Sequence, residues 1–269
     1  MSQLVDYQNK YKFVRLERND GVLELTIHRD GGPAEWSPYP GGIHDELGQA
    51  FYDVGRDREN RVVIITGTGD EFLTRLDWSV PDPDIGKTAY WDRISKEAKD
   101  LLMNLLDIEV PVIGAVNGPA FIHAEVPTMS DIVLAADHAV FADKAHSSAG
   151  IVPGDGVHIW WQMLLGPNRG RYYLLMSEEI SADEAKSLGF VAEILPREQL
   201  MNRAREIATS LAAKSMSMLR GSRAAFVQHI KRRMLDDLGF GLQLEGTNVL
   251  ALMQEQNAGP DWIAPHPAG

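Results

Sequence analysis

The residues with the clearest chemical potential follow a short apolar run in the middle of the chain. Residues 112–116 are small or β-branched, an Asn-Gly-Pro turn occupies 117–119, and a polar pair, His123 and Glu125, comes soon after it. Strand-to-helix turns carry chemistry in many α/β enzymes, because a helix N-terminus offers unpaired N–H groups and a positive dipole end. A histidine has an unperturbed pKa of about 6.5, so it can give or take a proton near neutral pH. We therefore expect acid–base chemistry at this turn.

These residues also have structural interpretations. A histidine in such a turn is more often a simple hydrogen-bonding group. Asp155, between two glycines, has the position of an Asx-turn or N-cap residue for a helix from Val157. The pair His123-x-Glu125 matches a fragment of the zinc-deaminase motif, but the cysteines that complete that motif are absent. We therefore expect no metal site.

Composition narrows the class of protein. With 269 residues and 44% hydrophobic content, the chain is long enough to bury one large core. A net charge of −12 argues against nucleic-acid and anionic-membrane partners, which require clustered cations. The absence of cysteine removes disulfides, thiolate metal sites and cysteine nucleophiles. No signal peptide or membrane-length apolar run is apparent, so we expect a cytoplasmic protein.

The elements that must hold the reactive residues alternate between strands and helices in the first part of the chain. An Asn-Asp-Gly turn at 19–21 predicts a hairpin from 13–16 to 22–27. Residues 30–42 are rich in glycine and proline, which predicts a loop, and helical spacing follows over 43–54. Other short apolar runs predict strands at 62–66, 112–116, 132–135, 140–141 and 191–195.

The later part of the chain is mostly helical in pattern. An amphipathic stretch predicts a helix over 94–106, and a capping box at 181–184 begins a short helix that ends at Gly189. Residues 198–253 are almost wholly helical in pattern, with an expected break near 239–241, and the proline-containing tail is expected to be irregular. The order predicts an α/β core followed by a helical region.

Five motifs in order resemble one superfamily over most of the chain. They are Arg58 to Gly67, Pro111 to Gly118, Asp131 to Ala136, Gly150 to Gly154 and Ser181 to Val191. Their order and spacing resemble the crotonase (enoyl-CoA hydratase/isomerase) superfamily. The resemblance implies an α/β fold, with a crotonase-like spiral of ββα turns over 1–197 and a C-terminal helical trimerisation region with an irregular tail over 198–269. It also implies a homotrimer or a dimer of trimers.

Two departures from the superfamily pattern are more informative than the matches. Members that act on CoA thioesters hold the thioester oxygen with two backbone N–H groups, from an alanine-glycine turn and from a glycine run. The corresponding segments here, 72–77 and 121–124, contain no glycine. Glycine permits backbone angles that larger residues disfavour, so these segments argue against an intact two-amide oxyanion hole. In this respect the chain is similar to the β-diketone hydrolases, the group that includes 6-oxocamphor hydrolase.

This similarity implies a retro-Claisen hydrolysis, in which water cleaves the C–C bond between two carbonyls, with cyclic diketones as the expected small-molecule substrates and no cofactor. Water must be activated, and the enolate that leaves must be stabilised and protonated. We expect His146 and Asp155 to activate the water, and His123 to bind a carbonyl oxygen and protonate the enolate. The remaining residues implied by the similarity are two that orient the water or the dyad, His44 and Glu245, and one substrate-binding candidate, Trp36.

Two other functions remain open from the sequence. The first is an enoyl-CoA hydratase or isomerase type of enzyme with an altered site, in which Glu125 or Asp155 is the acid or base. The second is a non-catalytic crotonase-fold subunit that serves in assembly or binding. The missing glycines weigh against the first alternative, and the concentration of ionisable groups at matched positions weighs against the second.

Overall fold

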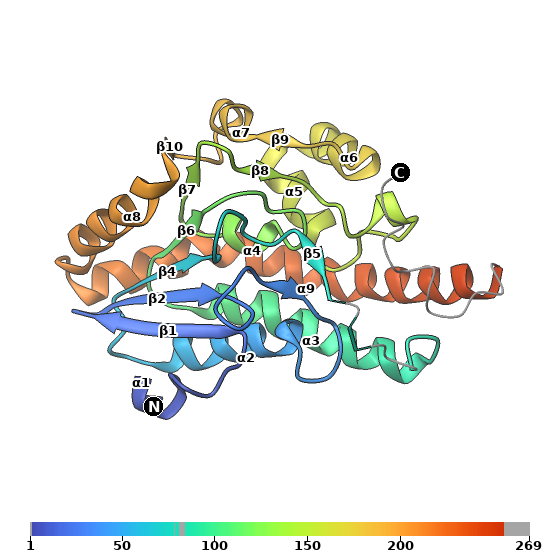
Figure 1. The fold of residues 1–269 in the computed structure, drawn as a ribbon, viewed down its shortest axis with the longest axis horizontal. Helices are drawn as coiled ribbons and strands as arrows, with labels where there is room; N and C mark the ends of the chain where they lie inside the picture. The colour runs from blue at the N-terminus through green and yellow to red at the C-terminus, as the bar shows by residue number, and fades with distance from the viewer. Residues whose placement is uncertain (1, 78, 81–83, 256–269) are drawn as a thin grey trace.

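The computed structural model describes residues 2–77, 79, 80 and 84–255, and its centre is a six-stranded sheet (Figure 1). The strand order is β1-β2-β4-β6-β7-β10, in which β1 and β2 are antiparallel and the other neighbours are parallel. These strands are β1 (Val14–Asn19), β2 (Val22–Ile27), β4 (Val62–Thr66), β6 (Val112–Val116), β7 (Ile132–Ala136) and β10 (Glu193–Leu195). Two small sheets pair β3 (Glu35–Trp36) with β5 (Arg75–Leu76), and β8 (Val140–Phe141) with β9 (Ile180–Ser181).

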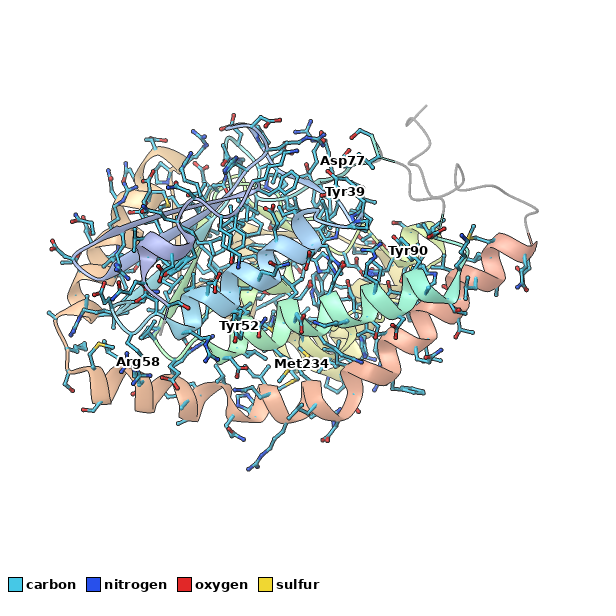
Figure 2. All side chains as sticks on the ribbon, turned by 90° about the horizontal axis from the view of Figure 1, so that it is seen from below. Tyr39, Tyr52, Arg58, Asp77, Tyr90 and Met234 are labelled. Carbon is cyan, nitrogen blue, oxygen red and sulfur yellow. The ribbon has the colours of Figure 1, made fainter. Side chains whose placement is uncertain are left out.

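Helices cover this sheet and extend beyond it. They are α1 (Leu4–Tyr7), α2 (Ile43–Arg56), α3 (Thr88–Asp107), α4 (Glu125–Thr128), α5 (Val157–Leu165), α6 (Pro167–Met176), α7 (Ala182–Leu188), α8 (Arg197–Ala212) and α9 (Met216–Glu255), with a short 3₁₀ turn, η1 (Ser147–Ala149). Helix α8 packs on β2, β4, β6 and β7, while α2 packs against α3. Figure 2 shows α9 running beside α3, with the buried Met234 near their contact.

The parallel strands end in loops that a single asparagine holds together. Asn117 follows β6, and its side-chain oxygen accepts a hydrogen bond from the Gly67 N–H after β4, at 3.0 Å. Its amide nitrogen donates to the carbonyls of Gly69 and Glu71, at 2.9 and 2.8 Å. A Cβ on Gly118 would lie 1.9 Å from the Asp70 carbonyl oxygen, so only glycine fits there. The loops that follow β4 and β6 therefore start from one fixed point.

Most of the predicted elements are confirmed. The hairpin, the helix from Ile43 and the strands at 62–66, 112–116 and 140–141 lie where the patterns place them. Ser181 caps α7 by accepting a hydrogen bond from the Glu184 N–H, at 3.2 Å. The Glu184 side chain instead accepts from the Tyr173 hydroxyl, so the predicted capping box is only half formed.

Some element boundaries differ from the predictions. Residues 30–42 include the short strand β3, which pairs with the distant β5 and so carries no local signal. Helix α3 begins at Thr88 and not at Ile94, and β10 begins at Glu193 and not at Val191. The helix expected directly after the Asn-Gly-Pro turn begins only at Glu125.

The predicted break near 239–241 is wrong, because α9 runs unbroken through it and the interruption lies at 213–215. Gly241 is required for a close approach. A Cβ there would lie 2.5 Å from the Gly154 carbonyl oxygen and 2.2 Å from the His158 ring. A Cβ on Gly154 would in turn lie 2.2 Å from the Gly241 carbonyl oxygen. Helix α9 thus touches the turn at 153–156 backbone to backbone.

Three sequence expectations remain open after the fold is known. The predicted irregular tail from Ala258 lies outside the described residues. The division at residue 197 stays a prediction, although α8 and α9 both pack on the preceding core. No helix in the described part of the chain combines the length and apolar character needed to cross a bilayer. The expected cytoplasmic location stays a prediction.

The glycine contact can be tested with two neighbouring substitutions in α9. Gly239→Ala should raise the free energy of unfolding by roughly 0.5–1 kcal/mol, because alanine favours helix and its Cβ would lie no nearer than 3.8 Å to Lys99. Gly241→Ala should lower it by roughly 1–3 kcal/mol, because the new Cβ overlaps the neighbouring backbone. Urea unfolding of the two variants checks both signs, and equal stabilisation by both would contradict the close contact.

Candidate active site

His123 lies on a segment that the backbone fixes on both sides. The N–H groups of Phe121 and Ile122 both donate to the Leu73 carbonyl, at 2.8 and 3.2 Å. The Leu73 N–H in turn donates to the Pro119 carbonyl, at 3.2 Å. His123 itself has a φ of +50°, the left-handed region that favours glycine. A non-glycine residue held there costs on the order of 1 kcal/mol, so its side chain is a candidate for function.

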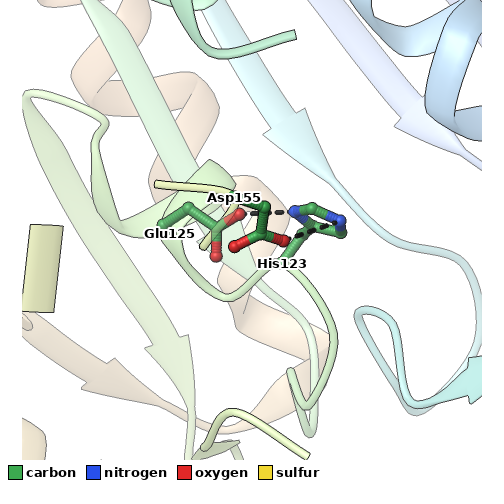
Figure 3. Close-up of side chains that lie close together, drawn as sticks. All are labelled: His123, Glu125 and Asp155. Atoms are coloured by element: carbon green, nitrogen blue, oxygen red, sulfur yellow. Dashed lines mark hydrogen bonds and ion pairs between the residues drawn. The ribbon is translucent and has the colours of Figure 1, made fainter. Parts of the chain in front are cut away.

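The His123 ring is held between two carboxylates. Its Nδ1 lies 2.5 Å from Oε1 of Glu125, which is the first residue of α4. Its Nε2 lies 3.5 Å from Oδ2 of Asp155, on the turn before α5. Figure 3 shows the contacts from the two carboxyl groups to the two ring nitrogens as dashed lines. All three side chains are nearly or completely buried.

The same oxygen of Asp155 also faces a second imidazole. Asp155 Oδ2 lies 3.4 Å from Nε2 of His146, which precedes the 3₁₀ turn η1. The Nδ1 of His146 hydrogen-bonds to Oδ1 of Asp143, at 2.8 Å. The result is a continuous series of side chains in which carboxylates and imidazoles alternate. We call this series the carboxylate–imidazole chain; it runs Glu125, His123, Asp155, His146, Asp143.

Asp155 also contacts the start of α5, as its predicted role as a helix N-cap residue requires. Its second oxygen, Oδ1, lies 3.5 Å from the Val157 N–H at the start of α5. That distance is long for a hydrogen bond. The helix-capping contact is therefore weak, and Oδ2 remains directed at the two imidazoles.

Glu245 reaches the site from α9. Its Oε1 lies 3.9 Å from Nε2 of His146, and its buried Oε2 has no hydrogen-bond partner among the described residues. A Cβ on Gly154 would lie 2.7 Å from the Glu245 Cβ, so the close contact of α9 with the turn also fixes this carboxyl group beside Asp155.

His44 forms a second buried carboxylate–imidazole pair. Its Nδ1 lies 2.9 Å from Oε2 of Glu97 on α3, and Glu97 Oε1 accepts a hydrogen bond from Arg93, also at 2.9 Å. The Trp36 ring lies beside both neighbouring histidines, with centroid distances of 5.2 Å to His44 and 4.0 Å to His123. Trp36 therefore supports the two rings from the β3 side of the site.

The carboxylates determine the charge of the two central histidines. Burial alone would lower the pKa of His123, but Glu125 and Asp155 outweigh it and raise the pKa. Burial would likewise lower the pKa of His146, but Asp143 and Asp155 raise it well above its usual value. For Asp155 itself, burial opposes ionisation, yet the two imidazoles hold its pKa far below the usual range. The centre of the site is a carboxylate between two imidazolium rings.

For Glu245 and His44, in contrast, burial outweighs the neighbouring charges, and the pKa of each shifts so that the neutral form is favoured. Burial raises the pKa of Glu245 to about 8, so at pH 7 it is a neutral acid that can donate a hydrogen bond. Burial lowers the pKa of His44, and the contact with Glu97 offsets this only in part. Neutral His44 keeps its proton on Nδ1, facing Glu97, and leaves Nε2 as an acceptor.

Part of this site lines a pocket of about 730 Å³, its open mouth included. The polar and aromatic side chains on its floor are Trp36, His44, His123, His146, Asp155 and Glu245. Its upper wall is apolar and is built from the β5 strand and the start of α3. The apolar lining residues there are Leu76, Ile85, Tyr90, Trp91 and Ile94. Among the described residues, the lining contains no lysine or arginine.

The whole chain can now be compared with known proteins. The model of the enoyl-CoA hydratase/isomerase family matches residues 17–255. The chain belongs to this family. A carnitinyl-CoA dehydratase of Salmonella arizonae is 31% identical over 206 residues, which cover 74% of each chain. A probable peroxisomal enoyl-CoA hydratase of Arabidopsis thaliana is 27% identical over 230 residues, covering 85% of this chain and 82% of that protein.

Solved structures of family members share the fold, and one of them is much nearer in sequence than others. A β-diketone hydrolase of the cyanobacterium Anabaena, bound to (S)-3-oxocyclohexyl acetic acid, has a TM-score of 0.88 and 44% identity, covering 92% of this chain and 98% of that one. An enoyl-CoA hydratase/isomerase of Mycobacterium paratuberculosis has a TM-score of 0.80 at 20% identity, covering 91% and 98%. The crotonase fold and the resemblance to β-diketone hydrolases are thus confirmed.

All six residues that the sequence pointed to line this one pocket: Trp36, His44, His123, His146, Asp155 and Glu245. Their chemical roles stay predictions. Sequence reasoning missed two carboxylates, Asp143 and Glu97. Asp143 precedes His146 by three residues, and Glu97 follows Arg93 by four on a predicted helix, so both had a weak spacing signal.

The backbone geometry also bears on the family's oxyanion hole. In this chain the N–H groups of Phe121 and Ile122 are already bound to the Leu73 carbonyl. These two donors are therefore not directed at a substrate oxygen. The next residue presents an imidazole, His123, in a backbone conformation that suits glycine. In this chain a side-chain donor, the His123 imidazole, thus follows two backbone N–H groups that are already occupied.

Two overlapping groups of side chains have metal-binding types and proximity. The donor atoms of His123, Glu125 and Asp155 lie within 4.8 Å of one another, and so do those of His146, Asp155 and Glu245. Both imidazoles have raised pKa values, so a metal bound here would have to displace their protons.

Proposed function

We propose that the protein is a β-diketone hydrolase that cleaves a C–C bond between two carbonyls by a retro-Claisen reaction. The main support is that two imidazoles, those of His123 and His146, share Asp155 on the floor of a pocket with an apolar wall. One ring can act on water while the other acts on a ketone oxygen. The 44% identity to the Anabaena β-diketone hydrolase supports the same activity.

The proposed reaction uses the two imidazoles in sequence. At a pH high enough to deprotonate His146, whose pKa is raised, its Nε2 takes a proton from water as the water oxygen attacks one carbonyl carbon. The C–C bond between that carbon and its neighbour breaks, so one fragment becomes a carboxylic acid and the electron pair forms an enolate. His123 donates a hydrogen bond to the enolate oxygen and then gives its proton to carbon. Asp155, between the rings, links the nitrogen that gains a proton to the ring that loses one.

The remaining polar residues would hold the reactants. Glu245, as a neutral carboxyl with a pKa of about 8, can donate a hydrogen bond to the attacking water. His44 offers an acceptor nitrogen, because Glu97 fixes its proton on Nδ1. The Trp36 ring lies tilted by 40° beside His123, with a centroid distance of 4.0 Å, close enough to attract a charged imidazole.

The pocket favours an uncharged substrate. Its lining carries two carboxyl groups, Asp155 and Glu245, and among the described residues it has no lysine or arginine to pair with an anion. Burying an unpaired negative charge beside Asp155 would be costly. A neutral, compact diketone fits the apolar wall.

The second candidate is an enoyl-CoA hydratase or isomerase type of activity. Relatives with hydratase and dehydratase names favour it, and Glu125 or Asp155 would be the acid or base. The engaged N–H groups of Phe121 and Ile122 weigh against a thioester oxyanion hole. The third candidate, a non-catalytic subunit, is weakened by the buried and strongly shifted groups of the carboxylate–imidazole chain.

We also propose that the protein forms a homotrimer or a dimer of trimers. Helix α9 exposes large apolar side chains at spacings that put them on one side of a helix: Met218, Phe226, Phe240 and Leu244. Exposed apolar faces of this kind are typical of protein–protein contacts.

The activity can be tested with a panel of bicyclic and 2-substituted cyclic 1,3-diketones. The purified protein should consume at least one of them and release a keto acid, followed by loss of substrate and by product mass. It should not hydrate crotonyl-CoA. Hydration of crotonyl-CoA without cleavage of any diketone would contradict the proposal and favour the second candidate.

Removing either member of the water-activating pair should depress turnover of the diketone. His146→Ala and Asp155→Asn should each lower kcat by roughly 10²–10⁴-fold, the range for loss of acid–base assistance. His138→Ala is the matched control, because His138 is an exposed histidine outside the pocket lining and away from α9, and the change should leave kcat unchanged. Circular dichroism confirms folding, and near-normal kcat in either test variant would remove that residue from the mechanism.

Light scattering tests the assembly. The wild-type protein should have the mass of three or six copies of the chain. The double variant Phe226→Asp, Phe240→Asp should shift it toward the monomer, because buried charges would oppose association. A monomeric wild-type protein would refute this assembly.

A further inference from the structure

Two histidines of the pocket, His146 and His44, each have a carboxylate partner on Nδ1. The charged groups around the two pairs differ. Nδ1 of His146 bonds to Asp143 at 2.8 Å, and Nδ1 of His44 bonds to Glu97 at 2.9 Å. Both pairs are buried. A carboxylate on Nδ1 fixes the tautomer and the orientation of a ring, so that Nε2 faces the opposite direction. The Nε2 of His146 therefore faces Asp155, 3.4 Å away on the pocket floor.

The two carboxylates differ in how their charge is balanced. Arg93 donates to Glu97 at 2.9 Å, so the negative charge of Glu97 is divided between a guanidinium and His44. Asp143 Oδ1 accepts from His146 and, at 3.2 Å, from the Ala145 N–H. Its second oxygen is buried and has no hydrogen-bond partner among the described residues. The charge of Asp143 therefore acts mainly on His146.

Several other ionisable groups face His146 and must be weighed against Asp143. They come from the segment before α4, the turn before α5, α5 itself and α9: His123, Asp155, His158 and Glu245. Asp155 divides its charge between two imidazoles. Glu245 is a neutral acid at pH 7, and His158 has a pKa lowered by burial and stays neutral. Asp143 is thus the carboxylate that serves His146 alone.

We propose that Asp143 is a positioning residue that directs Nε2 of His146 into the pocket and sets the pH at which this nitrogen becomes a base. The inference rests on the proposed hydrolase activity and deepens it. Since the carboxylates raise the pKa of His146, the base form is scarce at low pH. The value of kcat/KM should therefore rise with pH along an acid limb that lies above the usual histidine range. Without the charge of Asp143, this limb should lie at lower pH.

Two isosteric substitutions distinguish a role of the Asp143–His146 pair from a role of the Glu97–His44 pair. Asp143→Asn keeps a hydrogen-bond acceptor for Nδ1 and removes the charge, so the acid limb of kcat/KM should move to lower pH by about one unit or more. Glu97→Gln is the matched control at His44 and should leave the limb unmoved, whatever its effect on kcat. An unmoved limb in Asp143→Asn would overturn the proposal, and a limb that moves only in Glu97→Gln would assign the base to His44.

A measurement without substrate keeps the inference independent of the proposed activity. In the ¹⁵N spectrum of the full-length wild-type protein, His146 should keep its proton on Nδ1 at high pH and lose it from Nε2. Its pKa should fall in Asp143→Asn. A wild-type ring that instead keeps its proton on Nε2 would overturn the proposal, even if Asp143→Asn fails to fold. If no diketone is cleaved but this titration is observed, the proposed function fails and the role of Asp143 at His146 stands.

Discussion

One carboxylate that serves two imidazoles is the constraint on which this structure depends. Asp155 is buried, and a buried charge is tolerated only when it is paired and well solvated by protein groups. Each imidazole that neutralises it becomes charged in turn and needs a partner on its other nitrogen. Glu125 supplies one of these partners and Asp143 the other. The alternation of charges is thus self-consistent, and removing any member would leave a neighbour unbalanced.

Short-range backbone contacts bring the distant members of this arrangement together. Asn117 joins the loops after β4 and β6, which places the segment that carries His123. The backbone contact between Gly154 and Gly241 presses α9 onto the turn that carries Asp155. Small shifts at these contacts would therefore change the distances between the charged groups of the site.

Much of the fold could be predicted because its signals are local. Alternation, turn residues and helical spacing are properties of neighbouring positions, and ordered motifs added the family. The helix break near Gly241 was wrong because a glycine that permits close approach looks the same in sequence as one that ends a helix. The partners of His146 and His44 were harder to predict, since any of many acidic residues could fold against a ring. Only tertiary structure shows that Asp143 and Glu97 do so.

The left-handed backbone at His123 has a consequence for how such sites arise. The backbone at this position has a conformation suited to glycine, while the residue that occupies it carries an imidazole. A single change of side chain at this point can add or remove a titratable group while the loop keeps its backbone path. The strain at His123 is the cost of presenting an imidazole there, and glycine would adopt the same backbone angles without it. Few mutations would then be needed for a new activity to begin on the same scaffold.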